Sequence, residues 1–121
     1  MSCATYHNPG LGWGDGLPRP NRHGQKELDR HSPTIINSGY FDIQFWDGRA
    51  KTLEEQALGP IGSKVEMKQD LTELVKELGA IPGYVRRFNK VFPKVGINGA
   101  TIAKSIATFE RSVVSKNAPY D

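Results

Sequence analysis

The sequence predicts a mainly α-helical domain, and three observations lead to this fold class. Apolar residues recur at helical spacing through most of the second half of the chain, over residues 52–115. Residues that cap or stop helices flank each of these periodic segments. No segment alternates apolar and polar residues over a useful length, so we expect little or no β-sheet.

The first two predicted helices are short. Thr52 is placed to cap a helix over residues 53–58, which we expect to stop at the Gly59-Pro60 pair. Asp70, with a glutamate three residues later, has the spacing of a capping box and begins the next helix, which ends at a glycine. The apolar stripe of this second helix consists of Leu71, Leu74, Val75 and Leu78.

The last two predicted helices follow a proline and an asparagine. Pro82 suits the first turn of a helix. The apolar positions of the helix that begins at Pro82 recur at helical spacing and are Val85, Phe88 and Phe92. Asn98 is placed to cap the last and longest helix, with Ile97 before it positioned to pack onto Ile102. The apolar stripe of the last helix consists of Ile102, Ile106, Phe109 and Val113.

Residues 8–39 differ from the helical half because they are dense in glycine, proline, asparagine and aspartate. These residues break any periodic pattern and predict a long loop. A loop of this length is unusual in a compact domain unless it wraps around something or has a function. A cofactor would provide such an inner surface, whereas the alternative is a disordered tail. We expect one domain over residues 1–121, loop-rich at 8–39 and mainly helical at 52–115.

Composition and charge narrow the range of functions. The net charge is +3 with a pI near 9.1, but the 16 basic residues are dispersed among 13 acidic ones. No nucleic-acid partner is therefore expected. The single cysteine excludes an internal disulfide. No apolar stretch is long enough to span a bilayer and no apolar signal sequence begins the chain, so no membrane partner is expected.

The segment Cys3-Ala4-Thr5-Tyr6-His7 differs at one position from C-x-x-C-H, the motif that attaches haem c. In the full motif two thiols form thioethers with the haem vinyl groups, and the histidine ligates the iron. Here only Cys3 can form a thioether, because Tyr6 has no thiol. By itself the pattern is weak, since it also fits an ordinary cysteine and histidine in a short helix.

Longer stretches of the chain carry a more specific signal. They are residues 2–10, 23–24, 32–37, 44–50 (Gln-Phe-Trp-Asp-Gly-Arg-Ala), 55–57, 59–61, 65–67 and 119–121. Together they resemble the bacterial di-haem cytochrome c peroxidases over essentially the whole chain. The resemblance implies a cytochrome c-like helical haem domain with a long Gly/Pro-rich N-terminal loop. It is to the N-terminal domain of that family, which carries the peroxide-reducing haem, while a second domain carries the haem that receives electrons.

The resemblance also implies which residues surround the iron. His7 occupies the position of the proximal haem ligand, and Cys3 occupies the position of one thioether. His23 stands at the position of the family's second iron ligand, which leaves to open the iron to peroxide. A loop suits a ligand that has to leave. His31 occupies the position of an asparagine associated with calcium between the two domains, which puts calcium binding in doubt.

Three further residues match positions that take part in the family's reaction. Glu66 matches the group that moves a proton between the two oxygens of peroxide. Gln56 matches a neighbour that holds peroxide or water by hydrogen bonding. Outside this context both would be ordinary solvated side chains. Trp46 matches a tryptophan between the two haems that carries electrons, but without the second haem we expect it to be structural and partly exposed.

Two interpretations of function remain open. One is haem-dependent reduction of hydrogen peroxide to water, with a small cytochrome or copper protein as electron donor and a periplasmic location. The other is a haem-free or inert helical fragment, which Tyr6 favours. A third and narrower alternative is a relative of the di-haem enzymes that mature a protein substrate by oxidation. Because neighbouring parts of such a parent protein would cover Phe45 and Trp46, we also expect a homodimer or exchange of a terminal segment.

Overall fold

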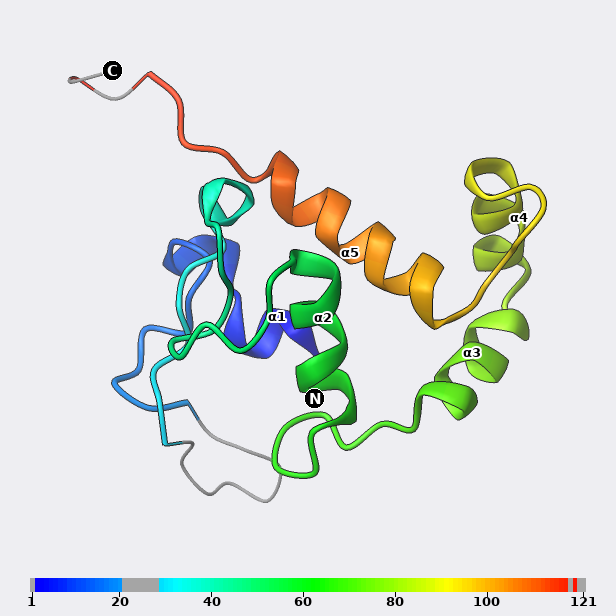
Figure 1. Cartoon of the computed structure of the whole chain (residues 1–121), viewed down its shortest axis with the longest axis horizontal. Coiled ribbons are helices and arrows are strands. Elements are labelled where there is room, and N and C mark those ends of the chain that lie inside the picture. The colour runs from blue at the N-terminus through cyan, green and yellow to red at the C-terminus, as the bar shows by residue number, and fades with distance from the viewer. Residues whose placement is uncertain (1, 21–28, 118, 120–121) are drawn as a thin grey trace.

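The computed structural model describes residues 2–20, 29–117 and 119. Helices form the regular structure of these ranges, and the only β pairing within them consists of two isolated bridges, Asn8 with Gly14 and Gln44 with Ala50. The helices are α1 (Cys3–Tyr6), α2 (Leu53–Gly62), α3 (Leu71–Gly79), α4 (Pro82–Val91) and α5 (Gly99–Ser112), with 3-10 turns η1 (Pro9–Leu11) and η2 (Ser38–Tyr40) (Figure 1). The predicted mainly helical fold class is therefore confirmed.

The core lies where α2 packs against α5 (Figure 1). On α5, Ala103 is 2% exposed and Ala107 is fully buried. On α2, Leu53 and Ile61 are buried at opposite ends of the helix. The two small alanines leave room for the α2 side chains to approach the α5 backbone, which is how interiors reach close packing. These two helices form the support onto which the N-terminal segment folds.

Side chains cap three of the helices as the sequence predicts. Thr52 Oγ1 accepts from the backbone N–H of Glu55 at 3.1 Å, at the start of α2. Asp70 Oδ1 accepts from two backbone N–H groups at the start of α3, at 2.8 and 3.0 Å. Asn98 and Thr101 form a reciprocal capping box on α5, with side-chain to backbone distances of 3.0 and 2.9 Å. These bonds satisfy backbone donors that have no partner inside a helix.

The prediction that the first of these helices stops at Gly59-Pro60 is wrong, because α2 continues to Gly62 with Pro60 inside it. Proline cannot donate to the carbonyl of Gln56, and such a position costs about 3 kcal/mol or more. Ile61 offsets this cost, since it is only 4% exposed and burial of an isoleucine contributes about 1.5–3 kcal/mol. The helix end is held further by a 2.9 Å bond from the Gln69 N–H to the Ile61 carbonyl.

The apolar stripe predicted for α5 is wrong in one part. Phe109 is 51% exposed, and the residue next to it, Glu110, is buried in its place. The buried face therefore runs through Ala103, Ala107 and Glu110. The Phe109 ring instead meets the Trp13 ring edge-to-face, with ring centroids 5.5 Å apart. The aromatic pair ties the outer side of α5 to the N-terminal segment.

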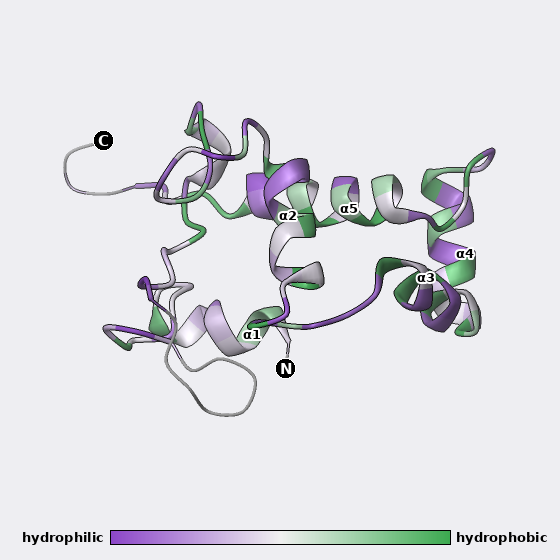
Figure 2. Cartoon of the chain, turned by 60° about the horizontal axis from the view of Figure 1, so that its bottom comes forward, coloured by the Kyte–Doolittle hydropathy of each residue, from purple (hydrophilic) through white to green (hydrophobic). Residues whose placement is uncertain are grey.

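Helices α3 and α4 form a hairpin at one end of the molecule (Figure 2). Both begin where the sequence predicts, after the cap Asp70 and at Pro82, and α3 ends at the predicted glycine, Gly79. Neither helix has a buried residue, and their apolar side chains are half-exposed or exposed. No helix in the described ranges is long and apolar enough to cross a membrane.

The N-terminal loop region is irregular over most of its described residues, as predicted, but contains η1 and the start of η2. Asn8 organises the first part of it. Its Oδ1 accepts from the N–H of Gly10 at 2.9 Å, and its backbone carbonyl accepts from the N–H of Trp13 at 2.9 Å. Gly12 and Trp13 both have positive φ angles, 65° and 62°. Residues 8–14 therefore turn back toward α1, and this turn positions the Trp13 carbonyl.

Candidate functional site

His7 follows α1 and is held by the turn formed by residues 8–14. Its Nδ1 lies 3.1 Å from the backbone carbonyl oxygen of Trp13. A carbonyl oxygen can only accept, so Nδ1 carries the proton in this contact and Nε2 keeps its lone pair. A backbone carbonyl on one ring nitrogen is the usual way in which a protein fixes a histidine whose other nitrogen binds a metal. The geometry of His7 therefore suits a metal ligand.

Cys3 occupies the first position of α1, which is preceded by a capping box between Ser2 and Thr5. Cys3 lies four residues before His7, a spacing that brings two residues to the same side of a helical turn. Cys3 keeps much of its surface exposed, yet partial burial raises the pKa of its thiol, and the Glu110 carboxylate raises it further. The thiol is therefore protonated at neutral pH and has no disulfide partner.

Tyr6 takes the place of the second thiol and is 6% exposed. Burial raises the pKa of its hydroxyl first, and the charges of Glu66 and Asp15 raise it further. Tyr6 is therefore within electrostatic reach of both carboxylates. Asp15 was not singled out by the sequence analysis. Its Oδ1 accepts from the N–H of Leu17 at 3.0 Å, whereas its buried Oδ2 has no hydrogen bond within the described part of the chain.

Glu66 lies half-buried in the turn that follows α2. Its backbone N–H and that of Lys68 both donate to the carbonyl of Ser63, at 3.1 and 2.9 Å. The next residue, Met67, donates to the carbonyl of Pro60 at 3.2 Å, so the turn folds back on the end of α2. Gln56 lies one helical turn before Pro60 and is also half-buried. The fold thus brings Glu66 within electrostatic reach of Tyr6. Gln56 lies in the first half of α2.

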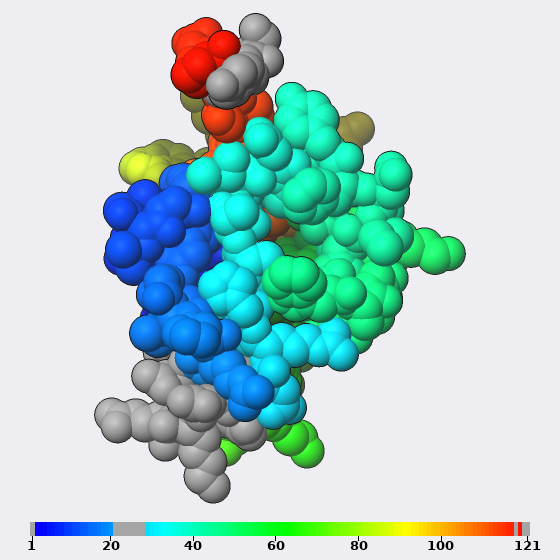
Figure 3. All heavy atoms as spheres, turned by 90° about the vertical axis from the view of Figure 1, so that its left-hand side faces the viewer, coloured from blue at the N-terminus to red at the C-terminus, as the bar shows by residue number. Residues whose placement is uncertain are grey.

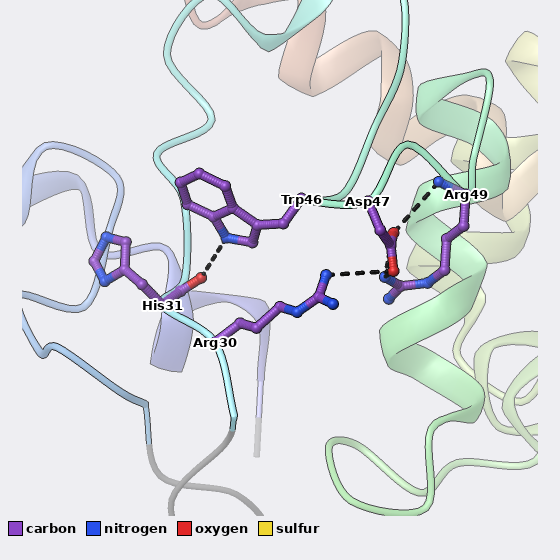
Figure 4. Close-up of polar contacts among 5 residues, drawn as sticks. All are labelled: Arg30, His31, Trp46, Asp47 and Arg49. Carbon is purple, nitrogen blue, oxygen red and sulfur yellow. Dashed lines mark hydrogen bonds and ion pairs between the residues drawn. The ribbon is translucent and has the colours of Figure 1, made fainter.

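Trp46 is 63% exposed and lies in a loop that precedes α2. Its indole Nε1–H donates to the backbone carbonyl of His31 at 2.9 Å (Figure 4). The His31 imidazole turns the other way, with Nδ1 2.8 Å from the carbonyl of Leu17. Trp46 is therefore not a core residue, although one polar contact holds it. His23 lies outside the described residues.

Glu110 is a buried carboxylate that sequence reasoning missed, and it is 9% exposed. Burial raises the pKa of Glu110 to about 7, and the charge of Glu54 adds to the rise while Arg111 opposes it. Arg111 is itself occupied by Glu54, with two guanidinium to carboxylate distances of 2.8 and 2.9 Å. The signal that could have indicated Glu110 is its helical spacing. Ala107 lies four residues after Ala103, and Glu110 lies three residues after Ala107, so all three share one helical face.

Two of the three residues at the haem-motif positions around α1 have side chains that suit a haem, and the third does not. His7 would ligate the iron through Nε2, and Cys3 offers one thiol for a thioether. Tyr6 offers no second attachment. Across residues 2–20, 29–117 and 119, no three histidine, cysteine or acidic side chains gather where they could hold a metal ion. A haem does not require such a cluster, because its ring nitrogens supply four of the iron ligands.

Comparison with known proteins identifies the class to which this helical domain belongs. The family model for di-haem cytochrome c peroxidases matches residues 1–121. The chain therefore belongs to the di-haem cytochrome c peroxidase family, whose members use c-type haem.

Individual relatives agree with this assignment. The chain is 42% identical to cytochrome c551 peroxidase of Pseudomonas aeruginosa, over all of this chain and 36% of that protein. It is 41% identical to the methylamine utilization protein MauG of Methylophilus methylotrophus, again over all of this chain and 36% of the relative. A crystal structure of a MauG-like protein associated with microbial copper homeostasis superposes with a TM-score of 0.90 at 29% identity, over 99% of this chain and 37% of that one. The chain thus spans about a third of the length of these relatives.

Proposed function

We propose that this chain is the peroxide-reducing haem domain of a di-haem peroxidase, and that residues 1–121 form a single domain. Hydrogen peroxide is reduced to water with electrons from a small cytochrome or copper protein, and the location is the periplasm. The observation that carries the proposal is the contact between His7 Nδ1 and the Trp13 carbonyl, which leaves Nε2 available for iron. When bound, haem c supplies the iron that passes electrons to peroxide.

The chain's own residues have two tasks in binding this cofactor. His7 would ligate the iron, because its ring is fixed by the Trp13 carbonyl. Cys3 holds the haem through one thioether, since Tyr6 cannot form the second. His23 is the removable second ligand by family resemblance. Binding therefore depends more on iron ligation and on packing than in a domain with two thioethers.

Glu66 and Gln56 handle the substrate. Reduction of hydrogen peroxide consumes two electrons and two protons and yields two molecules of water. Glu66 would take a proton from one oxygen of peroxide and return it to the other, which leaves as the first water. The two electrons and two further protons convert the remaining oxygen to the second water. Gln56 holds peroxide by hydrogen bonding. Both side chains are half-buried, so a molecule as small as peroxide can reach them. By family resemblance, Trp46 would carry electrons toward this domain where the second haem is present beside it.

A second candidate function is an inert, haem-free domain of the same family, and the burial of Tyr6 favours it. Tyr6 is 6% exposed, so the fold accommodates a bulky ring where the family motif has a thiol. A third candidate, oxidation of a protein substrate during its maturation, is raised by the likeness to MauG proteins. Bound haem distinguishes the peroxidase from the haem-free domain. Oxidation of a protein, rather than reduction of peroxide with electrons from a donor protein, would identify the third candidate.

The proposed chemistry is tested by peroxide turnover with a reduced cytochrome donor. Glu66→Gln should slow peroxide reduction by about 100-fold or more at unchanged haem content, the usual scale for loss of a positioned proton-transfer group. The matched control is Glu73→Gln on α3, where the carboxylate is exposed and pairs with Lys76. It should leave turnover unchanged. Equal rates for wild type and Glu66→Gln would exclude Glu66 from the reaction.

A further inference from the structure

A short closed loop, residues 44–50, presents Trp46 to solvent. The loop is closed by a 2.8 Å bond from the Gln44 N–H to the Ala50 carbonyl. Phe45, next to Trp46, has a φ of +63°, which is rare for a bulky residue, and Gly48 has a φ of +68°. Such conformations persist only where surrounding contacts impose them, and they concentrate at functional sites. The Phe45 ring lies against Gly59 of α2, and the polar contacts of the loop centre on Asp47.

Asp47 joins two guanidinium groups (Figure 4). Its two carboxylate oxygens accept from the same Arg49 nitrogen at 2.8 and 3.0 Å. Arg30, which comes from a different segment of the chain, reaches Asp47 Oδ2 at 3.3 Å. The Arg49 guanidinium also lies 3.5 Å from the centre of the Phe45 ring, a cation–π contact. The bonds to Arg49 are the first cause of the lowered pKa of Asp47, so the carboxylate is charged at neutral pH.

Two tethers run side by side between the same two segments (Figure 4). Trp46 bonds to the backbone of His31, and Asp47 bonds to the adjacent Arg30. A single tether would fix the position of the loop but would leave it free to rotate. Two tethers on neighbouring residues also fix its direction. Together with the ring of Phe45 under Arg49, they define one orientation for the Trp46 indole.

Packing of the Trp46 ring within this chain supplies little of this orientation. Trp46 is 63% exposed, and Figure 3 shows residues 29–50 at the surface of one face of the molecule, beside the N-terminal segment. Exposed ion pairs contribute only about 0–1 kcal/mol each to stability. The contacts around Asp47 therefore matter little for the free energy of unfolding. Their main consequence is geometric, because an exposed ring without them would sample several rotamers.

We propose that Asp47 is a positioning residue, which holds the exposed Trp46 in a single orientation by tethering its loop to the segment that carries Arg30 and His31. The use of this orientation rests on the proposed function, in which Trp46 carries electrons. A displacement of about 1 Å in a reacting group can cost about 100-fold in rate. An electron carrier therefore needs fixed geometry, and Asp47 contributes to it.

The test is the hydrogen exchange of the indole N–H groups, measured by NMR on the 15N-labelled chain. The two tryptophans, Trp13 and Trp46, give two indole signals. Asp47→Ala should speed exchange of the Trp46 indole N–H at least fivefold, with the Trp13 signal and the melting temperature unchanged. Arg30→Ala removes the same tether but keeps the contact between Asp47 and Arg49, and it should speed the same signal in the same direction.

The matched control is Glu54→Ala, which breaks another carboxylate–arginine pair, with Arg111. It should leave the Trp46 indole signal unchanged. Unaltered exchange at Trp46 in both Asp47→Ala and Arg30→Ala, or an equal acceleration in Glu54→Ala, would overturn the proposal. The measurement requires neither haem nor turnover. Loss of the proposed peroxidase function would appear only in the peroxide assay, so the two failures are distinguishable.

Discussion

The Nδ1 atom of His7 lies 3.1 Å from the backbone carbonyl of Trp13, a contact that assigns the ring proton to Nδ1 and leaves Nε2 free to bind a metal. Trp13 can offer this carbonyl because its φ is +62°, which turns the backbone back toward α1. The turn of residues 8–14 thus sets which ring nitrogen of His7, the residue just after α1, carries the proton. No periodicity in the sequence predicts this relationship.

The first prediction concerns covalent attachment. Because Tyr6 has no thiol, haem bound to this chain is held by at most one thioether, at Cys3. Cys3→Ala should therefore render all of the haem extractable in acidified organic solvent, with the iron still ligated in the native protein. Intact mass spectrometry under denaturing conditions is the measurement. A mass that corresponds to haem attached through two thioethers would contradict the prediction.

The second prediction concerns pH. Burial raises the pKa of Glu110 to about 7 in the folded chain, whereas an ordinary glutamate lies at 4.5. Between these values the folded state binds more protons than the unfolded state, so the stabilising effect of protonated Glu110 is lost as the pH rises. Because the side chain keeps some solvent contact, we expect the loss to be about 1–2 kcal/mol between pH 5 and pH 8.

Glu110→Gln provides the control for this effect. Glutamine is uncharged at every pH and has nearly the same shape. The variant should be about 1–2 kcal/mol more stable than wild type at pH 8 and within about 0.5 kcal/mol of it at pH 5. Urea unfolding at the two pH values gives both differences. A constant difference between variant and wild type across this range would show that Glu110 titrates as an exposed glutamate.

The third prediction concerns assembly. Four large apolar side chains within a stretch of seven residues are more than half exposed: Tyr40, Phe41, Ile43 and Trp46. Contiguous patches of this kind favour association. We expect a homodimer, through this surface or through exchange of a terminal segment, and Phe41→Ser should weaken the first kind of dimer. Light scattering after size exclusion measures the mass, and a monomer at high micromolar concentration would rule out both forms.

The helices were largely predictable because their signals are local. Asp70 and Asn98 cap helices through contacts within three residues, so a sequence window contains all the participants. The end of α2 was not predictable in this way. The helix passes Pro60, and Ile61 just after it is buried, and this burial is a property of the tertiary fold. The exposure of Phe109 and the burial of Glu110 beside it likewise depend on the tertiary fold.

The candidate site was predictable only as a set of residues. The sequence and its family resemblance indicated His7 and Glu66, but not that Tyr6 would lie within electrostatic reach of Glu66 and Asp15. These residues come from the N-terminal segment and from the turn after α2, and their proximity depends on the whole fold. The contacts of Asp47 with Arg30 and Arg49 were likewise invisible, because surface ion pairs leave no periodic signal.

The visible absorption spectrum of the purified protein tests the central claim most directly, because that claim is that His7 ligates a haem. The wild-type chain should show a Soret band, and His7→Ala should abolish it. His31→Ala is the matched control, since its Nδ1 also lies against a backbone carbonyl, at 2.8 Å from that of Leu17, and this variant should keep the band. A Soret band of unchanged position and intensity in His7→Ala, or no band in the wild type, would contradict the account.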